Sequence, residues 1–167
     1  MTLSRFAINL LETMSVEEFK SKYSYLYESI LPANSTIKAD LEYISNHWTG
    51  LSYDPWEESY AYGQFFNTIA FREALSIGAK LARGLGDDGA AEWYELQLDE
   101  VMEYLDDFWD SNDGYIKSSI GHQSGVEWKK KNLDTSVLIA VLFANSSTDS
   151  DPYSLRTLPF NRPNDSL

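Results

Sequence analysis

The chain has 167 residues, 43% of them hydrophobic, which is enough to bury one core and form one domain. Its 13 basic and 26 acidic residues give a net charge of −13, which argues against nucleic acid or an anionic membrane surface as a partner. The absence of cysteine excludes disulfides, thiolate catalysis and Cys-ligated zinc.

Hydrophobic spacing predicts three helices in the first part of the chain. The first covers residues 3–13. Ser15 followed by Glu18 is a capping box that opens a second helix, which is predicted to end at Pro32. The segment Asn34–Thr36 offers cap residues for a third helix, which is predicted to carry Ile37, Leu41, Ile44 and Trp48. The N-terminal part is therefore expected to be helical throughout.

Two longer helices are predicted next. Residues 65–82 are apolar on more than one face, as expected of a helix packed on both sides. Asp87 and Asp88 place negative charge at the start of the following helix, where it interacts favourably with the helix dipole. That helix is apolar on one side and acidic on the other. We interpret its acids as a solvated face.

The last part of the chain is predicted to be less regular. Residues 115–120 alternate like a strand, and residues 121–132 are interpreted as a surface loop whose three successive lysines are solvated. Residues 133–144 are predicted to form another helix that starts near Asp134. Residues 145–167 are rich in Ser, Asp and Pro and are expected to form an irregular tail.

Catalytic chemistry is most readily placed in the segment Ser52–Phe66. It combines the carboxylates of Asp54, Glu57 and Glu58 with many aromatic side chains. An aromatic environment disfavours ionisation, so one acid can stay protonated and donate a proton while a more solvated acid ionises. Aromatic rings beside carboxylates also suit a sugar. The alternative is structural, because acids next to aromatic residues are common at the rims of helices. The aromatic residues are Tyr53, Trp56, Tyr60, Tyr62, Phe65 and Phe66.

The residues Tyr53–Glu58, with the sequence YDPWEE, resemble the signature of the glucoamylases, the family 15 glycoside hydrolases. Further segments resemble the same family in the same order, and the resemblance runs from about Arg5 to about Ala144. These segments are Leu41–Ile44 with Trp48, Phe65–Ala70, Leu105–Trp109 with Ile116, and Leu133–Leu138.

Consecutive helices joined by short turns are compatible with a bundle, a helical repeat array or part of a larger ring of paired helices, although no motif repeats at a fixed period of about 30 to 45 residues. The resemblance implies the third architecture. We therefore expect an all-α fold that forms part of an (α/α)6 barrel and supplies about half of its helices. Residues 1–144 would be a partial glucoamylase-like catalytic domain, residues 145–167 a tail, and exposed inner helix faces would favour self-association.

The resemblance also implies roles for the signature residues. Glu57 aligns with the general acid that protonates the glycosidic oxygen, and Asp54 aligns with an aspartate that family signatures have treated as catalytic. Glu58 aligns with a carboxylate that binds substrate. Trp56 and Tyr53 would form the apolar wall of the sugar site. In an inverting glycosidase, a base would stand about 6.5–9.5 Å from the acid.

The function implied is inverting hydrolysis of terminal α-1,4-linked and α-1,6-linked glucose from starch or glycogen. No segment of residues 59–167 resembles the family's base segment, and the arginine and aspartate that hold the terminal sugar have no counterpart either. The isolated chain is therefore expected to hydrolyse glucan poorly. The alternatives are a non-catalytic sugar-binding or protein-binding helical module, and a gene fragment without a function of its own.

No cofactor and no metal site are expected, because His47 and His122 lack the spacing of metal ligands. The apolar run near the N-terminus is too short for a secretory signal peptide, and no segment approaches the length of a membrane span. Proteins of the family are commonly secreted or vacuolar, and the sequence leaves the compartment open.

Overall fold

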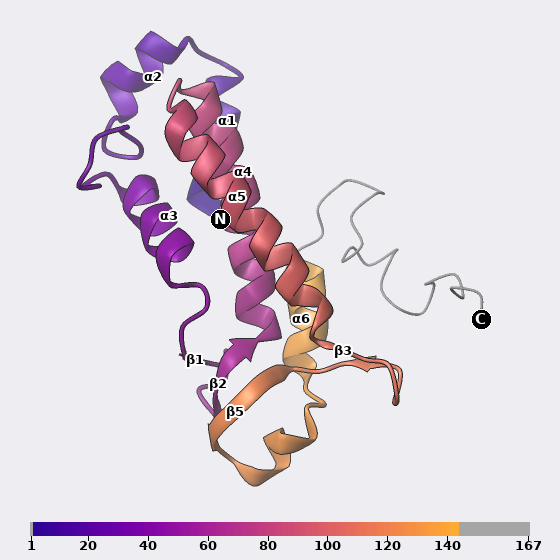
Figure 1. Ribbon diagram of the computed structural model, residues 1–167. Coiled ribbons are helices and arrows are strands. Elements are labelled where there is room, and N and C mark those ends of the chain that lie inside the picture. The colour runs from indigo at the N-terminus through magenta and orange to yellow at the C-terminus, as the bar shows by residue number, and fades with distance from the viewer. Residues whose placement is uncertain (1, 144–167) are drawn as a thin grey trace. The chain divides into compact units, whose positions relative to one another are not determined.

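The computed structural model describes residues 2–143 (Figure 1). These residues form six α-helices and five short strands, and they divide into two compact units. The first unit comprises residues 2–48 and 71–102, and the second comprises residues 49–70 and 103–143. The irregular tail predicted for residues 145–167 lies outside the described residues.

The first unit is helical. It contains α1 (Thr2–Leu11), α2 (Val16–Tyr23) and α3 (Thr36–His47), with parts of α4 (Phe65–Gly84) and α5 (Asp88–Asp106). The predicted cap of α2 is confirmed, because the Ser15 hydroxyl accepts a hydrogen bond of 3.2 Å from the Glu18 N–H. Gly78 lets α4 approach α3 closely, since a Cβ at this position would lie 2.4 Å from Leu41 Cδ2.

The prediction that the second helix continues to Pro32 is wrong, because α2 ends at Tyr23. The carbonyls of Tyr25 and Leu26 accept hydrogen bonds from Thr36 N and Ile37 N, at 3.0 and 2.8 Å. These two amides begin α3 and have no partner within their own helix. The chain after Tyr23 therefore satisfies the start of α3 instead of extending α2.

A buried lysine joins several elements of the first unit. The Lys38 side chain is only 2% exposed, and its ammonium lies 2.9 Å from Asp87 Oδ2 and 3.2 Å from Glu42 Oε1. The two carboxylates also accept hydrogen bonds from Tyr27 and Tyr94, at 2.8 and 2.7 Å. Because each carboxylate has both a cation and a hydroxyl as partners, burial of these charges is compensated.

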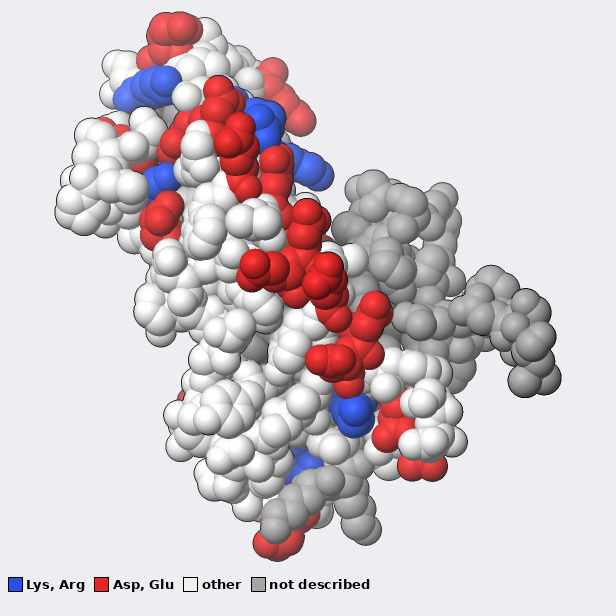
Figure 2. Space-filling view, viewed as in Figure 1, with Lys and Arg blue, Asp and Glu red and all other residues white. Residues whose placement is uncertain are grey.

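The acidic face predicted for the helix after Asp88 is confirmed. Figure 2 shows a row of acidic side chains following α5 on the viewed face. Glu92, Glu95, Asp99, Glu103 and Asp106 are all exposed. These carboxylates therefore contribute to the negative charge of the surface rather than to a buried site.

The second unit contains a three-stranded antiparallel sheet in the order β1–β2–β5. Its strands are β1 (Ser52–Tyr53), β2 (Ser59–Gln64) and β5 (Ser119–Gly125). The prediction of a surface loop from residue 121 is therefore wrong for residues 121–125, which pair with β2. Gly125 permits this pairing, because its φ is +129° and a Cβ would lie 2.2 Å from the Glu58 carbonyl oxygen.

The remaining elements of the second unit are a two-stranded ribbon and two short helices. Strands β3 (Trp109–Asp110) and β4 (Tyr115–Ile116) form the ribbon. The 3₁₀-helix η1 (Glu127–Lys131) follows β5 and precedes α6 (Thr135–Phe143). In the part of the chain that is described, no helix is long and apolar enough to cross a membrane.

Candidate active site

The signature acids lie on a tight turn that joins β1 to β2. Asp54 N donates to the Ser59 carbonyl at 2.9 Å, and Glu57 N donates to the Asp54 carbonyl at 3.0 Å. Asp54 Oδ1 accepts further hydrogen bonds from the N–H groups of Glu58 and Ser59, at 2.7 and 3.0 Å. Aspartate favours turns because its carboxylate can bond to nearby backbone amides in this way. The turn therefore depends on Asp54.

Glu57 occupies the exposed part of this turn. Its φ of 59° lies in the left-handed region, which is uncommon for residues other than glycine and costs about 1 kcal/mol or more. Such a conformation persists only where the surroundings determine it, and the hydrogen bonds of Asp54 provide that constraint. The Glu57 carboxylate makes no hydrogen bond or ion pair with any other described residue, so it is available to a ligand.

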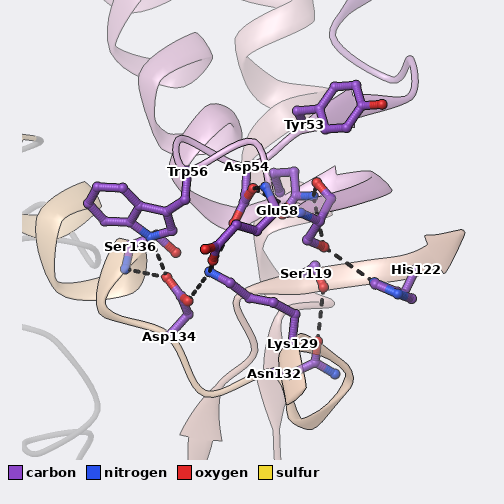
Figure 3. A network of polar contacts seen from close by, with 12 residues as sticks. Tyr53, Asp54, Trp56, Glu58, Ser119, His122, Lys129, Asn132, Asp134 and Ser136 are labelled. Carbon is purple, nitrogen blue, oxygen red and sulfur yellow. Dashed lines mark hydrogen bonds and ion pairs between the residues drawn. The ribbon is translucent and has the colours of Figure 1, made fainter. Parts of the chain in front are cut away.

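Lys129, from η1, lies between three carboxylates (Figure 3). Its ammonium is 3.0 Å from Asp54 Oδ2 and 3.4 Å from Glu58 Oε2, and it also donates to Asp134 Oδ2. The Lys129 side chain is 2% exposed. Burial alone would lower the pKa of Lys129, but its hydrogen bonds to Asp134 and Asp54 outweigh this effect and the pKa is raised above its ordinary value.

Asp134 connects the signature turn to the beginning of α6. Its Oδ1 atom accepts a hydrogen bond of 2.7 Å from Ser136 N, as expected of an N-cap residue, and another of 3.0 Å from Trp56 Nε1. Burial alone would raise the pKa of Asp134. Hydrogen bonds from Lys129, Ser136 and Trp56 favour the ionised form more strongly and lower this pKa to about 2.

A hollow of about 760 Å³ lies beside the turn. Two of its walls are the indoles of Trp56 and Trp128, which are 44% and 55% exposed. Carboxylates and apolar side chains complete the lining, a combination that suits the ring faces and hydroxyls of a sugar. The lining residues are Pro55, Trp56, Glu57, Glu58, Trp128, Lys129, Leu133, Asp134 and Thr135.

The structure brings three of the five predicted site residues together at the hollow, namely Trp56, Glu57 and Glu58. Asp54 is buried, and its two oxygens contact backbone amides and Lys129. Tyr53 points away from the polar network in Figure 3, and its exposed ring packs against Tyr60 with a centroid distance of 4.7 Å. Neither Asp54 nor Tyr53 lines the hollow.

Sequence reasoning missed Lys129 and Trp128. The interpretation of Lys129 as a solvated residue is wrong, because three carboxylates surround its buried ammonium. Three successive lysines gave no signal that one of them was buried. For Trp128 the sequence shows a tryptophan directly before these lysines, and its exposure is seen only in the structure. Among residues 2–143, no group of three or more His, Cys, Asp or Glu side chains is placed to hold a metal ion.

Known proteins similar to this chain include several glucoamylases. "Glucoamylase-1" of Schizophyllum commune is 35% identical over 105 residues, which are 62% of this chain and 17% of that protein. "Probable glucoamylase" of Schizosaccharomyces pombe is 33% identical over 122 residues, which are 73% of this chain and 25% of that protein. "Glucoamylase 1" of Rhizopus oryzae is 32% identical over 117 residues, with corresponding shares of 70% and 18%. No solved structure matches.

The chain spans about a fifth of the length of these curated relatives. The family model described as "Glycosyl hydrolases family 15" matches residues 4–160, which is most of the chain. The predominance of α-helices among the described residues agrees with this match, and the predicted fold class, part of an (α/α)6 barrel, is confirmed. On this match and on these relatives, the chain belongs to the family 15 glycosyl hydrolases.

Proposed function

We propose that this chain contributes the acid side of a glycosidase site that acts on terminal α-1,4-linked and α-1,6-linked glucose of starch or glycogen, with inversion at the anomeric carbon. Membership of family 15 and the names of the relatives support the class of enzyme. The observation that supports the site is the position of Glu57 and Trp56 on one turn beside a hollow of about 760 Å³.

Glu57 is the acid in this proposal. The hollow is also lined by Glu58 and Asp134, but both of these carboxylates contact Lys129. The Glu57 carboxylate has no such partner among the described residues and lines the same hollow. It would protonate that oxygen as the glycosidic bond breaks, which gives the departing sugar a neutral hydroxyl.

The other signature residues support the acid in different ways. Asp54 fixes the turn through its bonds to the Glu58 and Ser59 amides, so its catalytic contribution is to position Glu57. Glu58, with a side chain 41% exposed, can accept hydrogen bonds from sugar hydroxyls. The Trp56 ring provides an apolar face for the sugar ring, and Tyr53 offers a second exposed ring next to the turn.

Inversion also requires a base that activates water on the opposite face of the sugar, about 6.5–9.5 Å from the acid. No segment of residues 59–167 resembles the family's base segment. We therefore expect this chain alone to bind α-glucan more readily than it hydrolyses it. Binding without turnover, as in a sugar-binding module, is the second candidate function, and the same missing segment favours it.

Release of glucose from maltose and soluble starch tests the proposal. We would compare the unchanged chain with Glu57→Gln and with Glu103→Gln, which alters an exposed acid of α5. Loss of release by about 100-fold or more in Glu57→Gln alone, with β-glucose as the first product in proton NMR spectra, would support an inverting hydrolase. Equal release by Glu57→Gln would contradict the role of Glu57. Saturable maltose binding without release of glucose would support the second candidate function, a sugar-binding module.

A further inference from the structure

Two lysines are buried among the described residues, Lys38 in the first unit and Lys129 in the second. Both ammonium groups form ion pairs with carboxylates, but these carboxylates lie in different parts of the chain. The partners of Lys38 lie on or next to the helices of the first unit. The partners of Lys129 include two residues of the signature turn, so Lys129 contacts the proposed acid's own segment.

The three partners of Lys129 come from two places in the chain. Asp54 and Glu58 begin and end the turn that carries Glu57, while Asp134 caps α6. Figure 3 shows the Lys129 side chain reaching the carboxylates of the turn and that of Asp134. A backbone hydrogen bond also joins the turn to the segment that carries Lys129, because Val126 N, just before η1, donates to the Glu58 carbonyl at 3.0 Å. A single ammonium therefore connects the turn to the beginning of α6.

Charge explains why this position requires a cation. The side chains of Asp54 and Asp134 are 5% and 6% exposed, and without Lys129 their negative charges would face one another with little water between them. With Lys129, each has an ion pair in addition to its hydrogen bonds to backbone amides. A neutral side chain at position 129 would leave these carboxylates repelling each other and would separate the turn from α6.

We propose that Lys129 is a positioning residue of the sugar site, whose ammonium holds the Asp54–Glu58 turn against the start of α6 so that Glu57 and Trp56 keep their places at the hollow. The inference rests on the proposed function, because it assigns Lys129 a task only if that hollow receives the sugar. Lys129 itself does not donate or accept the catalytic proton. It acts through the residues that it holds.

The indole N–H of Trp56 reports on this arrangement without any sugar, because it donates to Asp134. The chain has five tryptophans, so a ¹⁵N-labelled sample gives five indole signals, and Trp56→Phe identifies the one required. In the unchanged chain we expect the Trp56 signal to be insensitive to pH between 4 and 7, since the pKa of Asp134 is about 2. In Lys129→Met, the signal should titrate with a midpoint at or above the ordinary 3.8.

Two further variants separate positioning from a general loss of stability. Lys38→Met removes the other buried lysine and should leave the Trp56 titration as it is in the unchanged chain. Lys129→Arg keeps the positive charge and should keep the low midpoint, although the larger guanidinium packs differently. A Trp56 titration in Lys129→Met identical to that of the unchanged chain would overturn the proposal. The same shift in Lys38→Met would also overturn it.

If Lys129→Met does not fold, the positioning role is tested with Lys129→Arg and with a measurement on the unchanged chain. The buried Lys129 ammonium should give a slowly exchanging ¹⁵N signal with nuclear Overhauser contacts to the Trp128 ring, whose centroid is 4.9 Å from Nζ. A rapidly exchanging Lys129 ammonium would refute the proposal, and so would a Trp56 midpoint near 3.8 in Lys129→Arg.

Maltose binding then distinguishes this inference from the proposed function. We expect Lys129→Met to bind maltose at least about tenfold more weakly than the unchanged chain, and Lys129→Arg to recover part of the loss. Undiminished binding by Lys129→Met would overturn the positioning role. If the unchanged chain binds no maltose, the proposed function fails, and the positioning role in sugar binding fails with it. In that case the Trp56 titration still determines whether Lys129 fixes the turn.

Discussion

Replacing Asp134 by asparagine should make the stability of this chain less sensitive to acid. The pKa of Asp134 is lowered from the ordinary 3.8 to about 2, because its bonds to Lys129, Ser136 and Trp56 outweigh the effect of burial. One pKa unit corresponds to about 1.4 kcal/mol, so the ionised carboxylate contributes about 2 kcal/mol to the free energy of unfolding. The Asp134 side chain is 6% exposed, so solvent screens this contribution little.

The sign of the pH dependence follows from the direction of the pKa shift. Because the pKa of Asp134 is lower in the folded state, its contribution is complete above the ordinary value of 3.8 and is lost as the pH falls through about 2. At pH 3 about half of it remains. The free energy of unfolding of the unchanged chain should therefore exceed that of Asp134→Asn by about 2 kcal/mol at pH 6 and by much less at pH 2.

Urea unfolding followed by circular dichroism at pH 6, 4, 3 and 2 measures this difference. Asp99→Asn, which changes an exposed acid of α5, is the matched control and should show no comparable loss at pH 6. The reasoning is refuted if Asp134→Asn is less stable than the unchanged chain by the same amount at every pH. It is also refuted if the difference at pH 6 is below about 0.5 kcal/mol.

Glycine substitutions test the packing, with urea unfolding as the measurement in each case. Gly125→Ala should lower the free energy of unfolding by about 3 kcal/mol, and Gly114→Ala should lower it by about 1 kcal/mol. Both glycines have a positive φ, but only at Gly125 would an added Cβ meet backbone atoms, so equal losses would contradict this. Gly78→Ala should cost about 1–3 kcal/mol, since Leu41 must move, and an unchanged midpoint would count against close α3–α4 packing. Gly89→Ala, with open space in α5, should stabilise by about 0.5 kcal/mol, and destabilisation would be inconsistent with that space.

Elements with strong local signals could be predicted from the sequence. The capping box at Ser15 and Glu18 and the apolar pattern from Phe65 depend on residues within a few positions of each other, and both mark helix starts in the structure. The end of α2 could not be predicted in the same way. Leu26 continues the apolar pattern, but its carbonyl bonds to the amide of Ile37 in another helix.

The site was only partly predictable for the same reason. Asp54, Trp56 and Glu57 could be proposed as site residues because they lie close together in the sequence and form a recognisable signature. Two of the three carboxylates around Lys129, those of Asp54 and Glu58, lie far from it in the sequence, and the pairing of β2 with β5 brings them together. A run of three lysines gives no local signal of that pairing.

The central claim is that the hollow between Trp56 and Trp128 receives an α-linked glucose unit beside Glu57. A titration of the ¹⁵N-labelled chain with maltose, followed through the five indole signals, tests this claim most directly. We predict saturable shifts of the Trp56 and Trp128 signals, an unchanged Trp48 signal, and no comparable response to the β-linked disaccharide cellobiose. Unchanged Trp56 and Trp128 signals, or equal responses of all five indoles to both sugars, would contradict the claim.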